Sequence, residues 1–311
     1  MDYYKRKLMS KNGEVTMYLA REFIIHDIGD RIKTVEEYAD NFGTGRGTIQ
    51  SAIKFLRDER AIDLESRGHL GTFMLSMDYK KLWDISGFET IMGVMPLPYS
   101  KRYEGLATGL YKAFEMANIP FSLAFMRGAG KRIETLGFGK YDFAITSKLA
   151  VDPKHSNFSS IEIISELGQE SYVGKHVIIF ADKKQNKILP NMRVGIDPDS
   201  IDQIILTNYE CRGLDVDFVE ISYAQIFPNL KNNLIDAAIW NGDELNEQLL
   251  DYGIVPLSNG NSNNEKEDTI AVIVANKDNK ILKDILTKRI KIEEISKVQE
   301  KVINGTMIPS Y

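Results

Sequence analysis

Apolar residues in the N-terminal part of the chain recur with the period of a helix. Val35, Ala39 and Phe42 stand at positions i, i+4 and i+7, a spacing typical of an amphipathic helix. Thr34 comes directly before this stripe, and Glu37 lies three residues after Thr34. In such a capping box the threonine oxygen accepts from the third helical amide while the glutamate reaches back. The pattern therefore predicts a helix that begins at Thr34.

A second apolar stripe follows a short glycine-rich interruption, at Ile49, Ile53 and Leu56. Residues 62–65 and 70–75 then have strand character, and the turn-forming segment 66–69 separates them. An earlier stripe within residues 13–30 predicts a helix that would complete a three-helix core. Three helices followed by a hairpin form the layout of a winged helix-turn-helix.

The second helix of this pair carries side chains suited to DNA. Residues 41–57 contain no acidic residue. A recognition helix needs amide or guanidinium groups for base edges, with hydroxyls and cations for phosphates. The candidate contacts lie at the first helix cap, on the second helix and at the hairpin tip: Thr34, Arg46, Thr48, Gln50, Ser51, Lys54, Arg67 and His69. An ordinary helical pair with a solvated polar face is the alternative that periodicity leaves open.

Two motifs in this region resemble the GntR-type winged helix of bacterial repressors. In that family an Arg-Gly-Thr run opens the recognition helix, as at Arg46, and a Gly-Thr-Phe run closes the wing, as at Gly71. The resemblance implies binding to a double-stranded DNA operator. Gly45 stands where the family usually has a serine cap, and Gln50 where arginine is common, so the operator sequence stays open.

From residue 90 onward the hydrophobic pattern alternates between strands and helices. The first series predicts strands at 91–95, 121–125 and 143–145 and helices at 103–118 and 131–137. The second predicts strands at 193–196, 217–221 and 237–240 and helices at 200–211 and 223–234. Strands at 173–181 and 270–275 are suited to cross between lobes, and 281–304 is helical. Because strands joined by crossover helices form parallel sheets, the sequence predicts an α/β fold with two doubly wound lobes.

These two series resemble the type 2 periplasmic-binding-protein fold, in which a ligand lies in the cleft between two lobes. In both halves an aspartate precedes a buried strand, at Asp142 and Asp236. A winged helix joined to such a unit is similar to the YhfZ family of bacterial regulators, over nearly the whole chain. We expect a DNA-binding domain at 1–78, a linker at 79–88, where the chain is polar with few apolar anchors, and a two-lobed sensor at 89–311.

In this fold a ligand sits outside the carboxyl ends of the strands. That rule selects loop residues in both lobes: Pro98, Tyr99, Ser100, Arg127, Gly128, Ala129, Gly130, Thr146, Ser147, Asp197, Asp199, Ser200, Ser222, Tyr223, Asn241 and Asp243. Arg127 suits a carboxylate or phosphate clamp, because its guanidinium binds bidentately and the glycines beside it expose amides near a helix start. Asp199 or Asp243 would pair with a ligand cation. The alternative is that the glycines only turn the chain and that Thr146 and Ser147 cap a helix.

Composition and charge indicate in which compartment the protein acts and whether it forms a dimer. The chain has 311 residues and a net charge of -5, and residues 1–80 are neutral overall. A neutral DNA-binding part would bind weakly alone, so a homodimer is expected. Cys211 is the single cysteine, which excludes an internal disulfide and indicates a reducing compartment. No signal-peptide core or long apolar run is present. We expect a cytoplasmic protein that does not enter a membrane.

The sequence offers no sign of a catalytic or metal site. The four histidines, His26, His69, His155 and His176, share no metal-ligand spacing with one another or with Cys211. A Gly-x-Ser-x-Gly elbow, a Walker loop and a complete dinucleotide fingerprint are all lacking. We expect a ligand-responsive regulator, without cofactor, that binds a small anionic or zwitterionic metabolite. An enzyme on the same two-lobed fold is the alternative.

Overall fold

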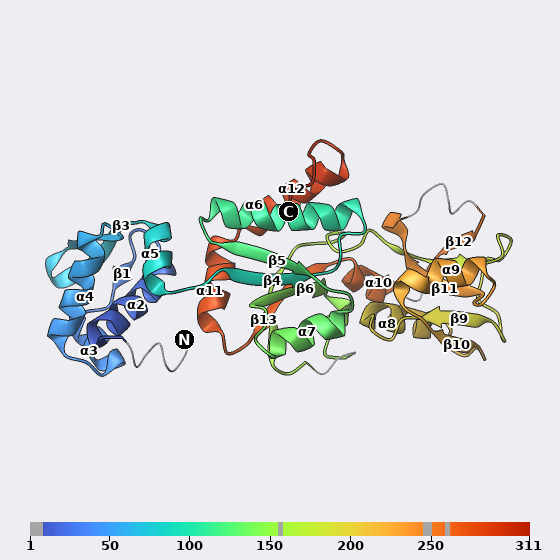
Figure 1. Ribbon diagram of the computed structural model, residues 1–311, viewed down its shortest axis with the longest axis horizontal. Coiled ribbons are helices and arrows are strands. Elements are labelled where there is room, and N and C mark those ends of the chain that lie inside the picture. The colour runs from blue at the N-terminus through green and yellow to red at the C-terminus, as the bar shows by residue number, and fades with distance from the viewer. Residues whose placement is uncertain (1–8, 155–157, 245–250, 259–261) are drawn as a thin grey trace. The chain divides into compact units, whose positions relative to one another are not determined.

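The computed structural model describes residues 9–154, 158–244, 251–258 and 262–311 (Figure 1). The chain forms two compact units, and each is described by itself. The first unit consists of Met1–Thr90, Phe114–Pro120 and Ile281–Ile290. The second consists of Ile91–Ala113, Phe121–Lys280 and Lys291–Tyr311. The first unit therefore contains two segments from within the range that the sequence assigns to the sensor.

The predicted capping box is confirmed at the start of helix α3 (Val35–Phe42). Thr34 Oγ1 accepts from the Glu37 amide at 3.2 Å, and Glu37 Oε2 accepts from the Thr34 amide at 2.7 Å. Gly43 ends this helix in the left-handed region, at φ 57°, a conformation that glycine adopts without steric cost. Helix α4 (Arg46–Asp58) follows after one further turn, with Gly45 at its N-cap. The two helices and their tight turn thus agree with the sequence.

The core of the first unit lies between these helices and α2 (Lys11–Ile24). Leu19, Phe23, Ile49 and Leu56 are fully buried there. On α3 the fully buried large side chain is Tyr38, which lies beside the stripe that periodicity selected. Its ring forms an edge contact with Phe23, at 6.2 Å between centroids.

The wing consists of β2 (Ile62–Ser66) and β3 (Thr72–Met77), which pair antiparallel. A 3₁₀ turn, η1 (Gly68–Leu70), joins them. The second strand begins later than the pattern suggested, because Gly71 has φ 103° and cannot continue an ordinary strand. The two-residue strand β1 (Arg31–Ile32), too short for a periodic signal, adds to β3 and completes the sheet order β1-β3-β2.

The segment 79–88, expected to be a linker, is largely helical. Helix α5 (Tyr79–Ser86) begins at Asp78, whose side chain accepts from the Lys81 amide at 3.1 Å. Leu82 and Trp83 are buried. A further helix of the first unit comes from much later in the chain, α11 (Lys280–Arg289).

The second unit contains two mixed sheets of five strands each. The first has the order β5-β4-β6-β13-β7 and is built from β4 (Ile91–Met95), β5 (Phe121–Phe125), β6 (Phe143–Ser147), β7 (Ile161–Glu166) and β13 (Ala271–Asn276). Strands β4, β5 and β6 are parallel, whereas β13 is antiparallel to both of its neighbours. Figure 1 shows α6 (Lys101–Met116) on one face of this sheet and α7 (Ala129–Gly137) on the other.

The second sheet repeats this arrangement in the order β10-β9-β11-β8-β12. Its strands are β8 (His176–Phe180), β9 (Arg193–Ile196), β10 (Asp217–Glu220), β11 (Ala237–Asn241) and β12 (Gly253–Pro256). Helices α8 (Ile201–Glu210) and α9 (Ile226–Lys231) contribute Leu206 and Leu230 to separate apolar clusters. Strands β8 and β13 each belong to one sheet, so the chain crosses between lobes in residues 167–175 and in the 257–270 region, which includes α10 (Ser262–Asp268). The expectation that strands cross between the lobes is therefore corrected.

Helix α12 (Ile292–Ile303) packs closely on α6. A Cβ added to Gly105 would lie 2.9 Å from the backbone oxygen of Gln299, and one added to Gly109 would lie 2.7 Å from that of Ile295. Only glycine permits this backbone approach. The predicted helix 281–304 is thus two helices, α11 and α12, which belong to different units.

Candidate functional site

A cavity of about 100 Å³ lies where the two sheets of the second unit present the ends of their strands. Several loops selected from the sequence line it, through Tyr99, Arg127, Gly128, Ala129, Asp197, Ser200, Tyr223 and Asn241. Further lining residues were not foreseen: Pro96, Leu97, Tyr103, Arg132, Tyr172, Val173, His176 and Asp202. The placement agrees with the rule that ligands bind beyond the carboxyl ends of strands.

The other selected residues do not line this cavity: Pro98, Ser100, Gly130, Thr146, Ser147, Asp199, Ser222 and Asp243. Several have structural partners instead. Ser100 Oγ accepts from the Tyr103 amide at 3.3 Å, at the start of α6. Ser222 forms a capping box with Gln225. Thr146 and Ser147 are fully buried in strand β6, so neither is an exposed loop residue.

Arg127 and Asp197 form an ion pair that joins the two lobes. Arg127 Nη2 lies 3.1 Å from Asp197 Oδ2, with the aspartate side chain 5% exposed. The same carboxylate accepts from the amides of Tyr223 at 2.8 Å and Asp199 at 2.9 Å. The partner of the predicted clamp is therefore a protein carboxylate. Asp199, expected to pair with a ligand cation, instead pairs with Lys131 at 2.5 Å.

Arg132 is a buried cation in the cavity wall, with 2% of its surface exposed. Its Nε donates to the Ile145 carbonyl at 3.0 Å, its Nη1 to the Met126 carbonyl at 2.9 Å, and its Nη2 to the Tyr172 hydroxyl at 3.0 Å. The side chain thus ties α7 to the ends of β5 and β6 while it faces the cavity. The Tyr172 ring meets Tyr103 edge-on, at 5.3 Å between centroids.

Three further titratable groups are buried beside it. His176 Nδ1 pairs with Asp268. Burial opposes the charged imidazole, but the Asp268 carboxylate outweighs this and raises the pKa of His176. Ser147 donates to Asp202 Oδ1 at 2.5 Å. Burial, reinforced by the nearby Asp268 charge, raises the pKa of Asp202 to about 7. Asp202 is therefore partly protonated near neutral pH.

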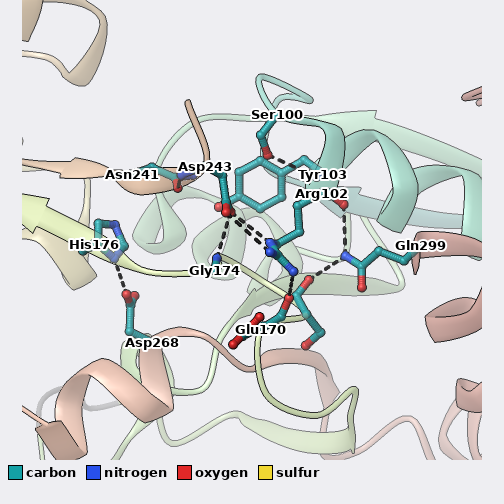
Figure 2. A network of polar contacts seen from close by, with 11 residues as sticks. Ser100, Arg102, Tyr103, Glu170, Gly174, His176, Asn241, Asp243, Asp268 and Gln299 are labelled. Atoms are coloured by element: carbon teal, nitrogen blue, oxygen red, sulfur yellow. Dashed lines mark hydrogen bonds and ion pairs between the residues drawn. The ribbon is translucent and has the colours of Figure 1, made fainter. Parts of the chain in front are cut away.

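A second contact between lobes surrounds Arg102 at the start of α6 (Figure 2). Its Nε donates to Asp243 Oδ2 at 2.9 Å, and the Gly174 amide donates to the same oxygen at 2.8 Å. Arg102 Nη1 also donates to the Glu170 carbonyl. Gln299 of α12 donates to the carbonyl of Arg102 at 3.0 Å. Asp243, predicted to hold a ligand cation, is thus part of a latch made of Arg102 and Asp243.

The predicted DNA contacts lie on α4, at the helix caps and in the wing. Gln50, Ser51 and Lys54 are exposed, whereas Thr48 is half-buried. Arg46 forms an exposed ion pair with Glu36. Arg46 thus already has a protein partner on α3.

The caps and the wing hold the remaining predicted DNA contacts. Arg67 pairs with Glu65 at 2.6 Å and lies 4.6 Å from the Phe73 ring centre. His69 is exposed in η1, and the Thr34 hydroxyl is occupied by the capping box.

Helix α11 is held to the end of α2 by two cations. Lys288 Nζ donates to the Ile25 carbonyl at 2.9 Å. Arg289 Nε donates to the Ile24 carbonyl at 3.0 Å, and its Nη1 lies 3.0 Å from Asp27. Its guanidinium also lies 4.5 Å from the centre of the Tyr79 ring. No local sequence pattern indicates this contact, because it joins residues far apart in the chain.

In the parts of the chain that the structure describes, no three His, Cys, Asp or Glu side chains gather as a metal site. His155 lies outside those parts. None of the described helices is long and apolar enough to cross a membrane. Cys211 is buried, and burial raises its thiol pKa to about 11, so it is a weak nucleophile at neutral pH.

Comparison with known families covers both units. A model described as the YhfZ C-terminal domain matches residues 78–311, and one described as a helix-turn-helix domain matches residues 27–74. An uncharacterized protein YhfZ of Escherichia coli K12 is 33% identical over 308 residues, which cover 99% of this chain and 100% of that protein. The likeness to the GntR type stays a prediction, because the matching model has only the general description.

Solved structures agree with this result. The crystal structure of YhfZ from Shigella flexneri is 33% identical, with a TM-score of 0.63, and covers 75% of this chain and 97% of that one. The periplasmic VFT2 domain of Bordetella pertussis BvgS is 13% identical, with a TM-score of 0.51, over 71% of this chain and 96% of that one. The second likeness concerns the fold alone. A helix-turn-helix followed by a two-lobed, periplasmic-binding-protein-like unit is thus confirmed.

Proposed function

We propose that this chain, which belongs to the YhfZ family, is a transcription regulator whose affinity for an operator changes when a small metabolite binds between its two lobes. The observation that carries the proposal is the cavity between the lobes, closed by charged contacts, in a chain that also has a helix-turn-helix. The cavity supplies a ligand site, and the helix-turn-helix supplies a DNA-binding surface.

The DNA-binding part of the proposal rests on α4 and the wing. The exposed amide of Gln50 and the guanidinium of Arg46 suit base edges, while Lys54 suits a phosphate. The first unit would bind as one half of a homodimer on a pseudo-palindromic operator, since half-site symmetry mirrors protein symmetry. Such a role requires that the protein act in the cytoplasm.

The ligand part rests on the charge and size of the cavity. Arginine and aspartate side chains both reach it, so a small anionic or zwitterionic metabolite can meet opposite charges there. The volume of about 100 Å³ lies below the ~300 Å³ at which sites for drug-sized ligands begin. The closed arrangement therefore admits a ligand of only a few heavy atoms.

Coupling follows from the contacts between the lobes. A ligand that touches both lobes favours the closed arrangement by its difference in affinity for the closed and open forms, and by no more. The Arg127–Asp197 pair and the Arg102–Asp243 latch belong to the closed form. Opening would break both, so the ligand and these ion pairs act on one equilibrium.

We do not propose catalysis. The buried hydroxyl of Ser147 donates to Asp202, and His176 is paired with Asp268. Ser147 is fully buried and does not line the cavity, so its hydroxyl is not placed to meet a substrate there, as acyl transfer requires. A cavity-dependent turnover of any metabolite would reverse this choice.

Native mass spectrometry of protein purified from its own host tests the proposal first, by detecting a retained metabolite. A DNA duplex selected from a random library is then titrated with and without that metabolite. We expect a shift in DNA affinity of about 5- to 150-fold. A metabolite that binds without changing DNA affinity would contradict the regulatory function, and footprints without two-fold symmetry would contradict the dimer.

A further inference from the structure

The guanidinium of Arg132 is a buried charge without a protein counterion in contact. Its three hydrogen bonds go to neutral oxygens: two backbone carbonyls and one tyrosine hydroxyl. Among the residues that the structure describes, no carboxylate forms an ion pair with it. A buried charge is costly unless it is paired, so the site is electrostatically incomplete.

The nearby carboxylates have other partners. Asp268 is paired with His176, Asp197 with Arg127, and Asp202 accepts from Ser147. An arginine carries five N–H groups in a planar fork. Three donate as described above, which leaves one on each terminal nitrogen. Two parallel N–H groups of this kind match the two oxygens of a carboxylate.

We propose that Arg132, flanked by Tyr103 and Tyr172, is the seat for the carboxylate of the metabolite, and that the ligand class is small carboxylic acids of a few heavy atoms. This inference rests on the proposed function and deepens it. It moves the anion-binding role from Arg127, which the sequence favoured, to a residue 2% exposed in the first turns of α7. Arg127 then acts with Asp197 to close the lobes.

The probes for this proposal are acetate, glycine and malonate, with acetamide and glycinamide as isosteres in which a neutral amide replaces the carboxylate, and inorganic phosphate as a second anion. Binding is measured by calorimetry and thermal unfolding at constant ionic strength. We expect at least one carboxylate to bind and to stabilise the fold while its amide does neither. Phosphate that binds more tightly than every carboxylate would overturn the carboxylate assignment.

Variants locate the site. Arg132→Lys keeps the charge and removes the planar fork, and should weaken carboxylate binding about tenfold or more, the loss of one charge-assisted hydrogen bond. Tyr172→Phe keeps the ring and removes the hydroxyl that holds Nη2, and should weaken binding less. Arg193→Lys is the matched control, because Arg193 pairs with Asp236 elsewhere in the second lobe.

Three results would overturn the assignment of Arg132 as the carboxylate site. Unchanged carboxylate affinity in a folded Arg132→Lys variant overturns the proposal. If Arg132→Lys does not fold, unchanged affinity in Tyr172→Phe overturns it. Failure of all the carboxylates to bind the wild type also overturns it. The proposed function would survive these results if a neutral metabolite from the host still changed DNA affinity.

A second inference concerns α11 and rests on different contacts. In sequence this helix lies between β13 and α12, which belong to the second unit, yet Ile281–Ile290 belongs to the first. Arg289, with 13% of its side chain exposed, donates to the Ile24 and His26 carbonyls, and Lys288 donates to the Ile25 carbonyl. These carbonyls lie at the C-terminus of α2, where helical partners are lacking and cations are favoured.

The helix that follows α11 is fixed to the latch. Gln299 of α12 donates to the carbonyls of Arg102 at 3.0 Å and Ser171 at 2.7 Å. Gly105 and Gly109 bring α6 against α12 without space for a Cβ. Movement of α6 or of the crossing segment at Ser171 must therefore displace α12, and the chain passes that displacement to α11.

We infer that Arg289 is a positioning residue through which α11 transmits lobe closure to α2. A double-mutant cycle tests this without a metabolite, using Arg102→Ala to weaken the latch and a duplex selected from a random library. We expect Arg102→Ala to change DNA affinity at least threefold in the wild type and less than 1.5-fold beside Arg289→Lys, a difference of ~0.4 kcal/mol or more. An equal change in both backgrounds, with both variants folded by circular dichroism, overturns the inference. So does the absence of any effect of Arg102→Ala.

Discussion

Arg102 and Asp243 join the two lobes across an Nε–Oδ2 distance of 2.9 Å, with only 15% and 18% of their side chains exposed. The carboxylate also holds the amide of Gly174 in a segment that crosses between lobes. One aspartate thus ties both lobes and their connection together. The closed arrangement depends on few such contacts, so it should respond to single substitutions.

We predict that Arg102→Ala favours the open arrangement. Removal of the guanidinium leaves Asp243 partly buried and unpaired, which should cost about 1–3 kcal/mol of closed-state stability. Hydrogen exchange should accelerate at the Gly174 amide, which donates to Asp243. Arg193→Ala is the control, because its partner Asp236 is in the same lobe. Equal exchange at Gly174 in the two variants would argue against the latch.

The DNA surface gives a second prediction. Arg46→Ala and Gln50→Ala should each weaken specific binding by about 1–3 kcal/mol if they contact base edges, whereas Lys54→Ala should lower affinity for all sequences alike. Because Glu36 pairs with Arg46, Glu36→Gln should raise DNA affinity at low salt. Titrations of selected and scrambled duplexes at one salt concentration measure these effects. Equal operator affinity for the wild type and the Arg46/Gln50 double variant would remove both residues from the interface.

The sequence predicted those parts of the fold that local chemistry determines. The capping box of Thr34 and Glu37 and the glycine that ends α3 involve neighbouring residues, so both could be recognised from the chain alone. The loops at strand ends followed from topology, and many of their residues line the cavity. The α5 helix was missed because its apolar anchors, Leu82 and Trp83, are too few for a periodic signal.

The missed residues of the cavity depend on tertiary contacts. Arg132 and Asp202 lie near the start of helices that point at the cavity, a position that the rule for strand ends did not include. Tyr172 lies in the segment that crosses between the lobes. His176 begins strand β8, which lies between the later strands β11 and β12 in its sheet. Helix α11 belongs to the first unit through contacts of Arg289 with the end of α2. The hydrogen bond from Arg289 to the Ile24 carbonyl joins residues 265 positions apart. Periodicity carries no information about such distances.

The buried Asp202 gives a prediction for pH. Its pKa in the folded protein, raised to about 7 by burial, exceeds its ordinary value. The folded state therefore holds the proton more tightly, and this contribution to stability is complete below about pH 4 and lost as pH rises through 7. His176, whose pKa is also raised in contact with Asp268, acts in the same direction. Arg132 opposes the shift of Asp202.

Urea unfolding of the wild type and Asp202→Asn between pH 4.5 and 8 measures this contribution. The amide of the variant cannot ionise but can still accept from Ser147. The free energy of unfolding of the variant, relative to that of the wild type, should therefore increase with pH, by about 1–4 kcal/mol at pH 8. A smaller slope from His176 should remain in both proteins. Parallel pH profiles would show that Asp202 ionises as easily in the folded as in the unfolded chain.

The last prediction joins the ligand to the DNA through Arg127. Its pair with Asp197 exists only when the lobes are close, and Arg127 is distant in sequence from Arg46 and Gln50. Arg127→Ala should therefore reduce the ligand response and, because it also removes a contact of the closed form, shift operator affinity without ligand in the same direction as Arg102→Ala. Linkage requires reciprocity: if the ligand changes DNA affinity by a coupling of about 1–3 kcal/mol, operator DNA must change ligand affinity by the same factor. Both titrations are run on the wild type and on Arg127→Ala, with the metabolite retained from the host, and Arg193→Ala is the control because its partner Asp236 is in the same lobe. A ligand response equal in Arg127→Ala and wild type would remove the Arg127–Asp197 pair from the closing mechanism. Unequal factors in the two directions would show that ligand and DNA do not act on one equilibrium.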